Sequence, residues 1–302
     1  MADFYVLFNP KAGNGRGDKQ AHKLDTLWND RTLIYRDVTA IPDVRDFVQS
    51  LPDDAGVVLC GGDGTLNHFV NDMGGEDPGR SVYFFGTGSG NDFLKDIGRS
   101  IDDPPILLNP YMVDLPTVTV NGMTRYYLNG IGYGLDGYCC EEGDKIRATS
   151  DKPVNYTPIA VKGLAYGYKR CHAFVTVDGE TTEFDKVWIA PCMKGRYFGG
   201  GMMCAPTQDR MDPTRKVSVM VMRSKSKLKA LIVFPSIFKG THIRHTDMVT
   251  ILQGHDVSIR FDKPTALQID GETVLNVTEY AVTTRHGAKQ AQQETKEFAN
   301  AG

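Results

Sequence analysis

The sequence predicts an α/β fold in two parts: a three-layer α/β domain at residues 1–110 and a β-sandwich domain at residues 111–285. Strand and helix patterns alternate along the first part, which is typical of βαβ units around a parallel sheet. After Pro104 and Pro105, alternating segments are separated by turn dipeptides, as in antiparallel sheets. The length of 302 residues agrees with two domains or one large one, since one domain usually holds roughly 100–200 residues.

The first domain is expected to consist of strands and helices in alternation. The expected strands lie at 4–8, 33–38, 56–60 and 82–85, and the expected helices at 18–30, 42–51 and 66–73. The run at 56–60 is apolar throughout, which is typical of a strand buried on both faces of a parallel sheet. Pro42 is expected to open the helix at 42–51.

The second domain is expected to be mostly antiparallel, with one or two helices inserted. Three alternating segments end in Asn-Gly or Asp-Gly, which indicate hairpins because both central residues of a type I′ turn need a positive φ. These dipeptides are Asn121-Gly122, Asp178-Gly179 and Asp270-Gly271. Residues 286–302 are a polar tail, which either frays or packs back on the first domain.

The composition excludes several classes of function. A net charge of −3 argues against broad electrostatic capture of nucleic acid, so no nucleic acid partner is expected. No segment reaches the ~18 apolar residues of a membrane span, and the N-terminus lacks the pattern of a signal peptide. Six cysteines without a CxxC pair indicate reduced thiols. We therefore expect a cytoplasmic protein.

Three glycine-rich turns follow consecutive strands of the first domain, at residues 9–17, 61–67 and 86–92. None has the Walker A pattern. Glycines in such turns let backbone N–H groups face an anion, and ligands of open α/β sheets bind at the carboxyl edge of the strands. A single turn of this kind is weak evidence, and three coincidental tight turns are the alternative. Three in succession predict a nucleotide-binding domain.

The motifs in and beyond these turns resemble those of the diacylglycerol-kinase-type lipid kinases. They are Asn9-Pro10-Lys11-Ala12-Gly13, GGDGTLN at 61–67, GSGNDF at 88–93 and Asp270-Gly271-Glu272. This family includes soluble bacterial lipid kinases and the sphingosine and ceramide kinases, with NAD kinases as distant relatives. The resemblance covers nearly the whole chain. It implies an ATP-binding α/β domain and a β-sandwich domain, with the active site in the cleft between them.

The resemblance also implies ATP and Mg²⁺ as cofactors, a lipid hydroxyl as acceptor, and a set of site residues. Asp63 and Asp92 would organise the catalytic Mg²⁺ directly or through waters, and Glu272, next to Asp270, would be the general base. The implied nucleotide contacts are Asn9, Pro10, Lys11, Ala12, Gly13, Thr39, Gly61, Gly62, Asp63, Gly64, Thr65, Leu66, Asn67 and Ser89.

A second, structural Mg²⁺ is implied in the C-terminal domain. Its ligands would be the Asp212 carboxylate and the carbonyl groups of Asp209 and Thr214. The sequence departs from the family here, because Pro213 follows Asp212 where glycine is usual. It also departs at Gly86, where the family usually has proline.

Several readings stay open from the residues alone. Asp63 and Asp92 could simply cap the helices that follow them. The tripeptide Asp-Gly-Glu occurs at 178–180 as well as at 270–272, and only the resemblance selects the second copy. An NAD kinase-like or other soluble-metabolite kinase is the alternative activity. A non-catalytic nucleotide- or lipid-binding regulator is a further one.

One basic and apolar stretch bears on the partners of the protein. Residues 223–246 hold lysines and arginines but no acidic residue, around an apolar centre at 228–238. Such a stretch suits a protein that binds peripherally to an anionic membrane, where its lipid substrate would lie. The alternative is a buried helix with solvated flanks. A homodimer is a further open possibility.

Overall fold

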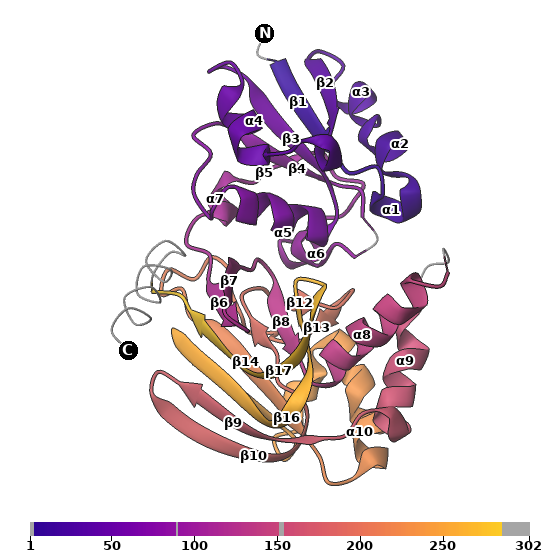
Figure 1. Cartoon of the computed structure of the whole chain (residues 1–302), viewed down its shortest axis with the longest axis vertical. Helices are drawn as coiled ribbons and strands as arrows, with labels where there is room; N and C mark the ends of the chain where they lie inside the picture. The colour runs from indigo at the N-terminus through magenta and orange to yellow at the C-terminus, as the bar shows by residue number, and fades with distance from the viewer. Residues whose placement is uncertain (1–2, 89, 151–153, 286–302) are drawn as a thin grey trace. The chain divides into compact units, whose positions relative to one another are not determined.

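The computed structural model describes residues 3–88, 90–150 and 154–285, and the chain divides into two compact units, Met1–Leu115 and Pro116–Gly302 (Figure 1). The mixed α/β fold class is confirmed, with an α/β unit followed by a β-sandwich-like unit. The predicted polar tail at 286–302 lies outside the described residues.

The first unit is built on a five-stranded sheet in the order β2-β1-β3-β4-β5, parallel except for the last strand. Its strands are β1 (Asp3–Phe8), β2 (Thr32–Asp37), β3 (Gly56–Gly61), β4 (Val82–Gly86) and β5 (Ile106–Leu107). Its helices are α1 (Ala12–Gly15), α2 (Gly17–Ala21), α3 (Leu24–Leu27), α4 (Val44–Ser50), α5 (Asp63–Asp72), α6 (Asp92–Asp96) and α7 (Asn109–Met112), with a 3₁₀ turn η1 (Val38–Ala40). All residues of β3 are buried, as its apolar run predicts.

Side chains that alternate along β1 place helices on both faces of this sheet. Phe4 and Val6 pack in one apolar cluster with Leu24 of α3. Tyr5, which points to the opposite face, meets Phe47 of α4 with the ring centroids 6.0 Å apart. The first unit is therefore a three-layer arrangement.

Two helix predictions in this unit need correction. The single helix expected at 18–30 is wrong, because the chain tightens between α2 and α3. The N–H groups of Lys23 and Asp25 bond to carbonyls only three residues back, at Gln20 and His22. The next helix begins at Val44 rather than at Pro42, and Asp43 caps it, since its side chain accepts a 2.8 Å hydrogen bond from the N–H of Asp46.

The second unit is mainly one large antiparallel sheet. Its strands are β6 (Thr117–Val120), β7 (Met123–Tyr126), β8 (Gly130–Tyr133), β9 (Cys171–Val177), β10 (Glu180–Ile189), β11 (Cys192–Met193), β14 (Val217–Arg223), β15 (Val249–Gly254), β16 (Asp256–Ile269) and β17 (Glu272–Thr283), and a small pair β12 (Tyr197–Phe198) and β13 (Met202–Met203) lies apart. Its helices are α8 (Leu135–Arg147), α9 (Tyr156–Lys162) and α10 (Lys227–Val233), with the helical turns η2 (Gly163–Gly167), η3 (Phe234–Lys239) and η4 (Thr241–Arg244).

The long strand β16 makes this sheet curve back on itself. Its first half pairs with β9 and its last residues pair with β8, so the path β8-β11-β14-β10-β9 returns to β16. The register against β17 shifts between Arg260 and Leu267, where the strand bends. The enclosed core is aromatic: the rings of Tyr133 and Phe261 stack with centroids 3.9 Å apart. The result is the sandwich-like unit of Figure 1.

The three predicted hairpins are confirmed as β6–β7, β9–β10 and β16–β17. Each dipeptide has a positive φ at both residues, which is the geometry that Asn-Gly and Asp-Gly favour. Among the residues that the structure describes, none of the helices has the length and apolar character that a membrane span requires.

Candidate active site

The three glycine-rich turns converge at one edge of the first sheet. Strands β1, β3 and β4 are parallel neighbours, so the turns that follow them leave the sheet side by side. Backbone hydrogen bonds join the turns: the N–H of Thr87 donates to the carbonyl of Gly61 at 2.7 Å. The N–H of Asn9 donates to the carbonyl of Cys60 at 3.2 Å. The predicted nucleotide loops therefore form one continuous surface.

Glycine is required where these turns touch. A Cβ on Gly88 would lie 2.4 Å from the Cα of Gly62, so the second and third turns meet backbone to backbone. A Cβ on Gly13 would lie 2.6 Å from the carbonyl oxygen of Thr87, and Gly13 has a φ of +58°. In contrast, a Cβ on Gly64 would meet no atom within 4 Å. Gly64 faces open space at the start of α5.

The carboxylate of Asp63 links the second turn to the third. Its two oxygens accept hydrogen bonds from the N–H groups of Asp92 and Phe93, at 2.8 and 3.0 Å. These N–H groups belong to the first turn of α6. Asp63 is the first residue of α5, but its side chain caps α6, the helix that follows the third turn. Asp63 and Asp92, the two residues predicted to organise the metal, therefore lie next to each other.

The remaining nucleotide contacts implied by the resemblance fall into an accessible and a buried group. Lys11 is exposed, and its N–H donates to the side-chain oxygen of Asn9 at 2.9 Å. Thr39 is exposed in η1, at the carboxyl end of the strand beside β1. Leu66 and Asn67 are fully buried in α5, so their side chains belong to the core of the first unit.

The other implied contacts belong to the three glycine-rich turns. Ser89 lies outside the described residues. Thr65 accepts a 3.3 Å hydrogen bond from the side-chain amide of Asn9, which ties the second turn to the first. Pro10, Ala12, Gly61 and Gly62 lie within residues 9–17 and 61–67. Pro10 has no N–H to offer a phosphate, and the N–H of Ala12 donates to the carbonyl of Asn9 at 3.0 Å.

In the second unit, Asp270 holds two distant segments together, which the sequence did not predict. Its buried carboxylate accepts hydrogen bonds from the N–H groups of Leu128, Asn129 and Gly130, at 2.6, 2.9 and 2.9 Å. These bonds fasten the tip of the β16–β17 hairpin to the start of β8. Asp270 thus positions the hairpin tip, and its membership of the catalytic group stays a prediction.

Glu272 follows at the first position of β17 and forms an ion pair with Arg125 of β7. Both side chains are partly buried, which strengthens such a pair relative to one on the open surface. Arg125 was missed by the sequence reading, because 147 residues separate it from Glu272 and no local pattern marks it.

The structure separates the two Asp-Gly-Glu tripeptides. Asp178 resembles Asp270 in one respect. Its carboxylate accepts hydrogen bonds from the N–H groups of His255 and Asp256, at the start of the neighbouring strand β16. Both aspartates therefore anchor their hairpin. The glutamates differ, since Glu180 is exposed and Glu272 is held by Arg125.

The loop predicted to hold a structural Mg²⁺ contains hydrogen bonds among its own groups. The oxygens of the Asp212 carboxylate accept from the N–H and the hydroxyl of Thr214, at 2.8 and 2.7 Å, and these bonds lower its pKa. The carbonyl of Asp209 accepts from the N–H of Asp212 and from Gln208. Within the described ranges, no three His, Cys, Asp or Glu residues are grouped as metal ligands. An oxygen that accepts one hydrogen bond keeps a further lone pair, so the structural Mg²⁺ site stays a prediction.

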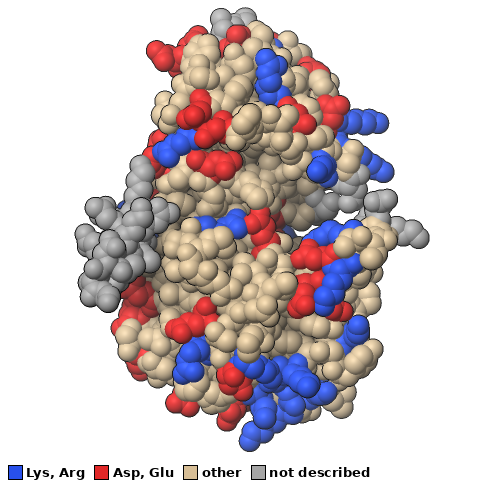
Figure 2. Space-filling model, viewed as in Figure 1, with Lys and Arg blue, Asp and Glu red and all other residues tan. Residues whose placement is uncertain are grey.

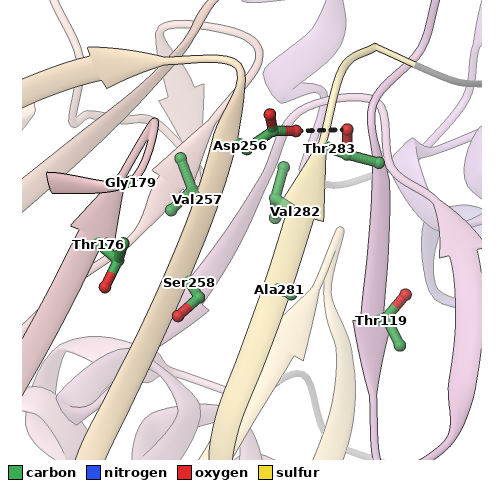
Figure 3. Close-up of a pocket in the computed structure, with 9 residues that line it drawn as sticks. All are labelled: Thr119, Thr176, Gly179, Asp256, Val257, Ser258, Ala281, Val282 and Thr283. Atoms are coloured by element: carbon green, nitrogen blue, oxygen red, sulfur yellow. Dashed lines mark hydrogen bonds between the residues drawn. The ribbon is translucent and has the colours of Figure 1, made fainter. Parts of the chain in front are cut away.

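A pocket of about 300 Å³ lies elsewhere, on the sheet of the second unit (Figure 3). Residues of β6, β9, β16 and β17 line it, Val257 and Val282 among them, and the Thr283 hydroxyl donates a hydrogen bond to Asp256 at 2.7 Å. None of the predicted site residues is among those that line it.

Two family models match this chain. Residues 3–110 match the diacylglycerol kinase catalytic domain, and residues 129–285 match the YegS C-terminal NAD kinase beta sandwich-like domain. The two matched ranges agree with the two units of the fold.

Individual relatives are distant. A Bacillus subtilis (strain 168) protein named "Putative lipid kinase YtlR" is 24% identical, over 90% of this chain and 94% of its own. A diacylglycerol kinase of Mycobacterium tuberculosis is also 24% identical, over 81% of each chain. The crystal structure of a diacylglycerol kinase from Bacillus anthracis str. Sterne matches with a TM-score of 0.62 and 18% identity, over 93% of each chain. At that identity the structural match shows the fold alone.

Proposed function

Because this chain belongs to the diacylglycerol-kinase-type lipid kinase family, we propose that it transfers the γ-phosphate of ATP to a hydroxyl group of diacylglycerol or a related lipid. The observation that carries this proposal is the convergence of the three glycine-rich turns at the carboxyl edge of β1, β3 and β4. Backbone N–H groups at such an edge suit the phosphates of a nucleotide, and Gly64 faces open space there at the start of α5.

Asp63 and Asp92 are the residues that would hold a catalytic Mg²⁺. The donor chemistry fits, since Mg²⁺ prefers oxygen ligands and keeps several waters, and a carboxylate oxygen that accepts one hydrogen bond has a further lone pair. Because both carboxylate oxygens of Asp63 already accept hydrogen bonds from N–H groups, contact with Mg²⁺ through waters suits Asp63 best. Bound there, the ion would neutralise charge on the phosphates.

Glu272 is the proposed general base, which takes the proton of the lipid hydroxyl as the phosphoryl group arrives. Its ion pair with Arg125 supports this role, since the pair fixes the orientation of the carboxylate. Asp270 supports it indirectly by holding the hairpin tip on which Glu272 begins its strand.

A direct assay separates this proposal from its alternatives. The purified chain is incubated with labelled ATP and Mg²⁺ and, separately, with diacylglycerol, ceramide and sphingosine in mixed micelles, and with NAD. We expect label in a lipid. Label in NAD alone would indicate a soluble-metabolite kinase. Binding of ATP without label in any acceptor would indicate a non-catalytic regulator.

A further inference from the structure

The helix α10 presents two large apolar side chains to solvent. Leu228 and Ile232, one turn apart, are 68% and 70% exposed. The opposite side of the same helix is buried, through Ala230 and Val233. The alternative of a buried helix therefore explains the inward face of α10 only. The exposed apolar side chains on its outward face need a different explanation.

The neighbouring turn η2 extends this apolar surface. Helix α10 packs against η2, and the ammonium of Lys227 donates to the carbonyl of Ala165 at 2.8 Å. The next residue, Tyr166, is 72% exposed. We use the term "α10 face" for Tyr166, Leu228 and Ile232 together with Lys225, Lys227 and Lys229.

Lysines flank these apolar side chains. Lys225, Lys227 and Lys229 are all exposed, and Lys229 forms an ion pair with Asp247. Figure 2 shows basic side chains gathered at the end of the second unit where α10 lies. A helix with apolar residues outward and lysines beside them has the pattern of helices that lie in the interface of a bilayer.

We propose that the α10 face docks on the surface of an anionic lipid bilayer. Leu228, Ile232 and Tyr166 enter the boundary between headgroups and acyl chains, and the lysines contact anionic headgroups. Each lysine near such a surface strengthens binding by about fivefold. A second copy of the chain fits the α10 face less well than a bilayer does. A two-fold symmetric contact would bring the lysines of one copy close to those of the other, and like charges repel.

This docking goes beyond the proposed phosphotransfer and does not depend on it, since vesicle binding is measured without ATP. The full chain is sedimented with vesicles of phosphatidylcholine alone and with vesicles that contain phosphatidylglycerol, at low and high salt. We expect binding to the anionic vesicles, weakened by salt.

The double variant Leu228→Ser/Ile232→Ser tests the apolar part. We expect its binding to anionic vesicles to fall by about ten- to a hundredfold, since two largely exposed side chains no longer enter the bilayer. Leu275→Ser is the matched control, because Leu275 of β17 is 51% exposed but lies outside the α10 face. Circular dichroism checks that both variants are folded.

Several results would overturn the proposal. They are no binding of the wild type to anionic vesicles, equal binding to neutral and anionic vesicles, and equal loss in the double variant and the Leu275→Ser control. A dimer in size-exclusion chromatography that the double variant abolishes would assign the face to self-association instead.

Discussion

Glu272 and Glu180 occupy the same position in two hairpin tips of identical local sequence, but their surroundings differ. Glu272 pairs with Arg125, whereas Glu180 is exposed. We expect Glu272→Gln to lower kcat by about 10²- to 10⁴-fold, because the amide cannot take a proton. ATP affinity should change little. Turnover and nucleotide affinity, measured in the lipid assay, check this.

Glu180→Gln is the matched control for that variant. It should leave turnover unchanged and alter the free energy of unfolding by no more than ~0.5 kcal/mol, as an exposed substitution usually does. An inactive Glu180→Gln beside an active Glu272→Gln would show that the wrong tripeptide has been chosen.

Arg125 is expected to act through Glu272. Replacing it with Gln removes the partner that orients the carboxylate, so kcat should fall by about tenfold while KM for ATP stays the same. In the Glu272→Gln background the same change should cost almost nothing further, since coupled residues are not additive. A double-mutant cycle on kcat measures this. Independent losses in the two variants would contradict the positioning role.

At the scale of elements, the candidate nucleotide site depends on the close backbone contact between the second and third glycine-rich turns. Gly88→Ala would place a Cβ against the Cα of Gly62, so the turns must separate. We expect a lower free energy of unfolding, by about 1–3 kcal/mol, together with weaker ATP binding. Chemical denaturation and calorimetric titration with ATP measure the two effects.

Gly64→Ala is the informative partner of that variant. The Cβ of the new alanine would meet no atom within 4 Å, and alanine is a better helix former than glycine in α5. The free energy of unfolding should therefore stay unchanged or rise. Weaker ATP binding without a loss of stability would then indicate that a phosphate approaches Gly64. Destabilisation by Gly64→Ala, with Gly88→Ala harmless, would contradict the packing of the turns.

At the scale of the whole molecule, the features that the sequence predicted well are those that local chemistry decides. Asn121-Gly122 and Asp270-Gly271 specify their turns because few other residues accept a positive φ. The apolar run of β3 specifies a buried strand in the same way. Glycines after parallel strands predict turns at one edge, since topology brings those ends together.

The features that sequence reasoning missed depend on contacts between distant segments. Asp63 caps a helix 29 residues further along the chain, and that geometry exists only once β3 and β4 are paired. The pair of Arg125 and Glu272 likewise requires the assembled second unit. The break between α2 and α3 reflects tight turns that helical spacing alone does not reveal.

The last prediction uses the full chain and its division into two units. If ATP binds at the carboxyl edge of the first sheet, it stabilises that unit by mass action, by about 2.7 kcal/mol at a hundredfold excess over Kd. Amides of β3 that exchange only when this unit unfolds should then exchange about a hundredfold more slowly with ATP and Mg²⁺ present. The amides of β10 in the second unit serve as the reference in the same hydrogen-exchange experiment, with NAD as the control ligand. No slowing in residues 3–115 at saturating ATP would refute the nucleotide site, and slowing with NAD but not with ATP would assign the turns to a different nucleotide.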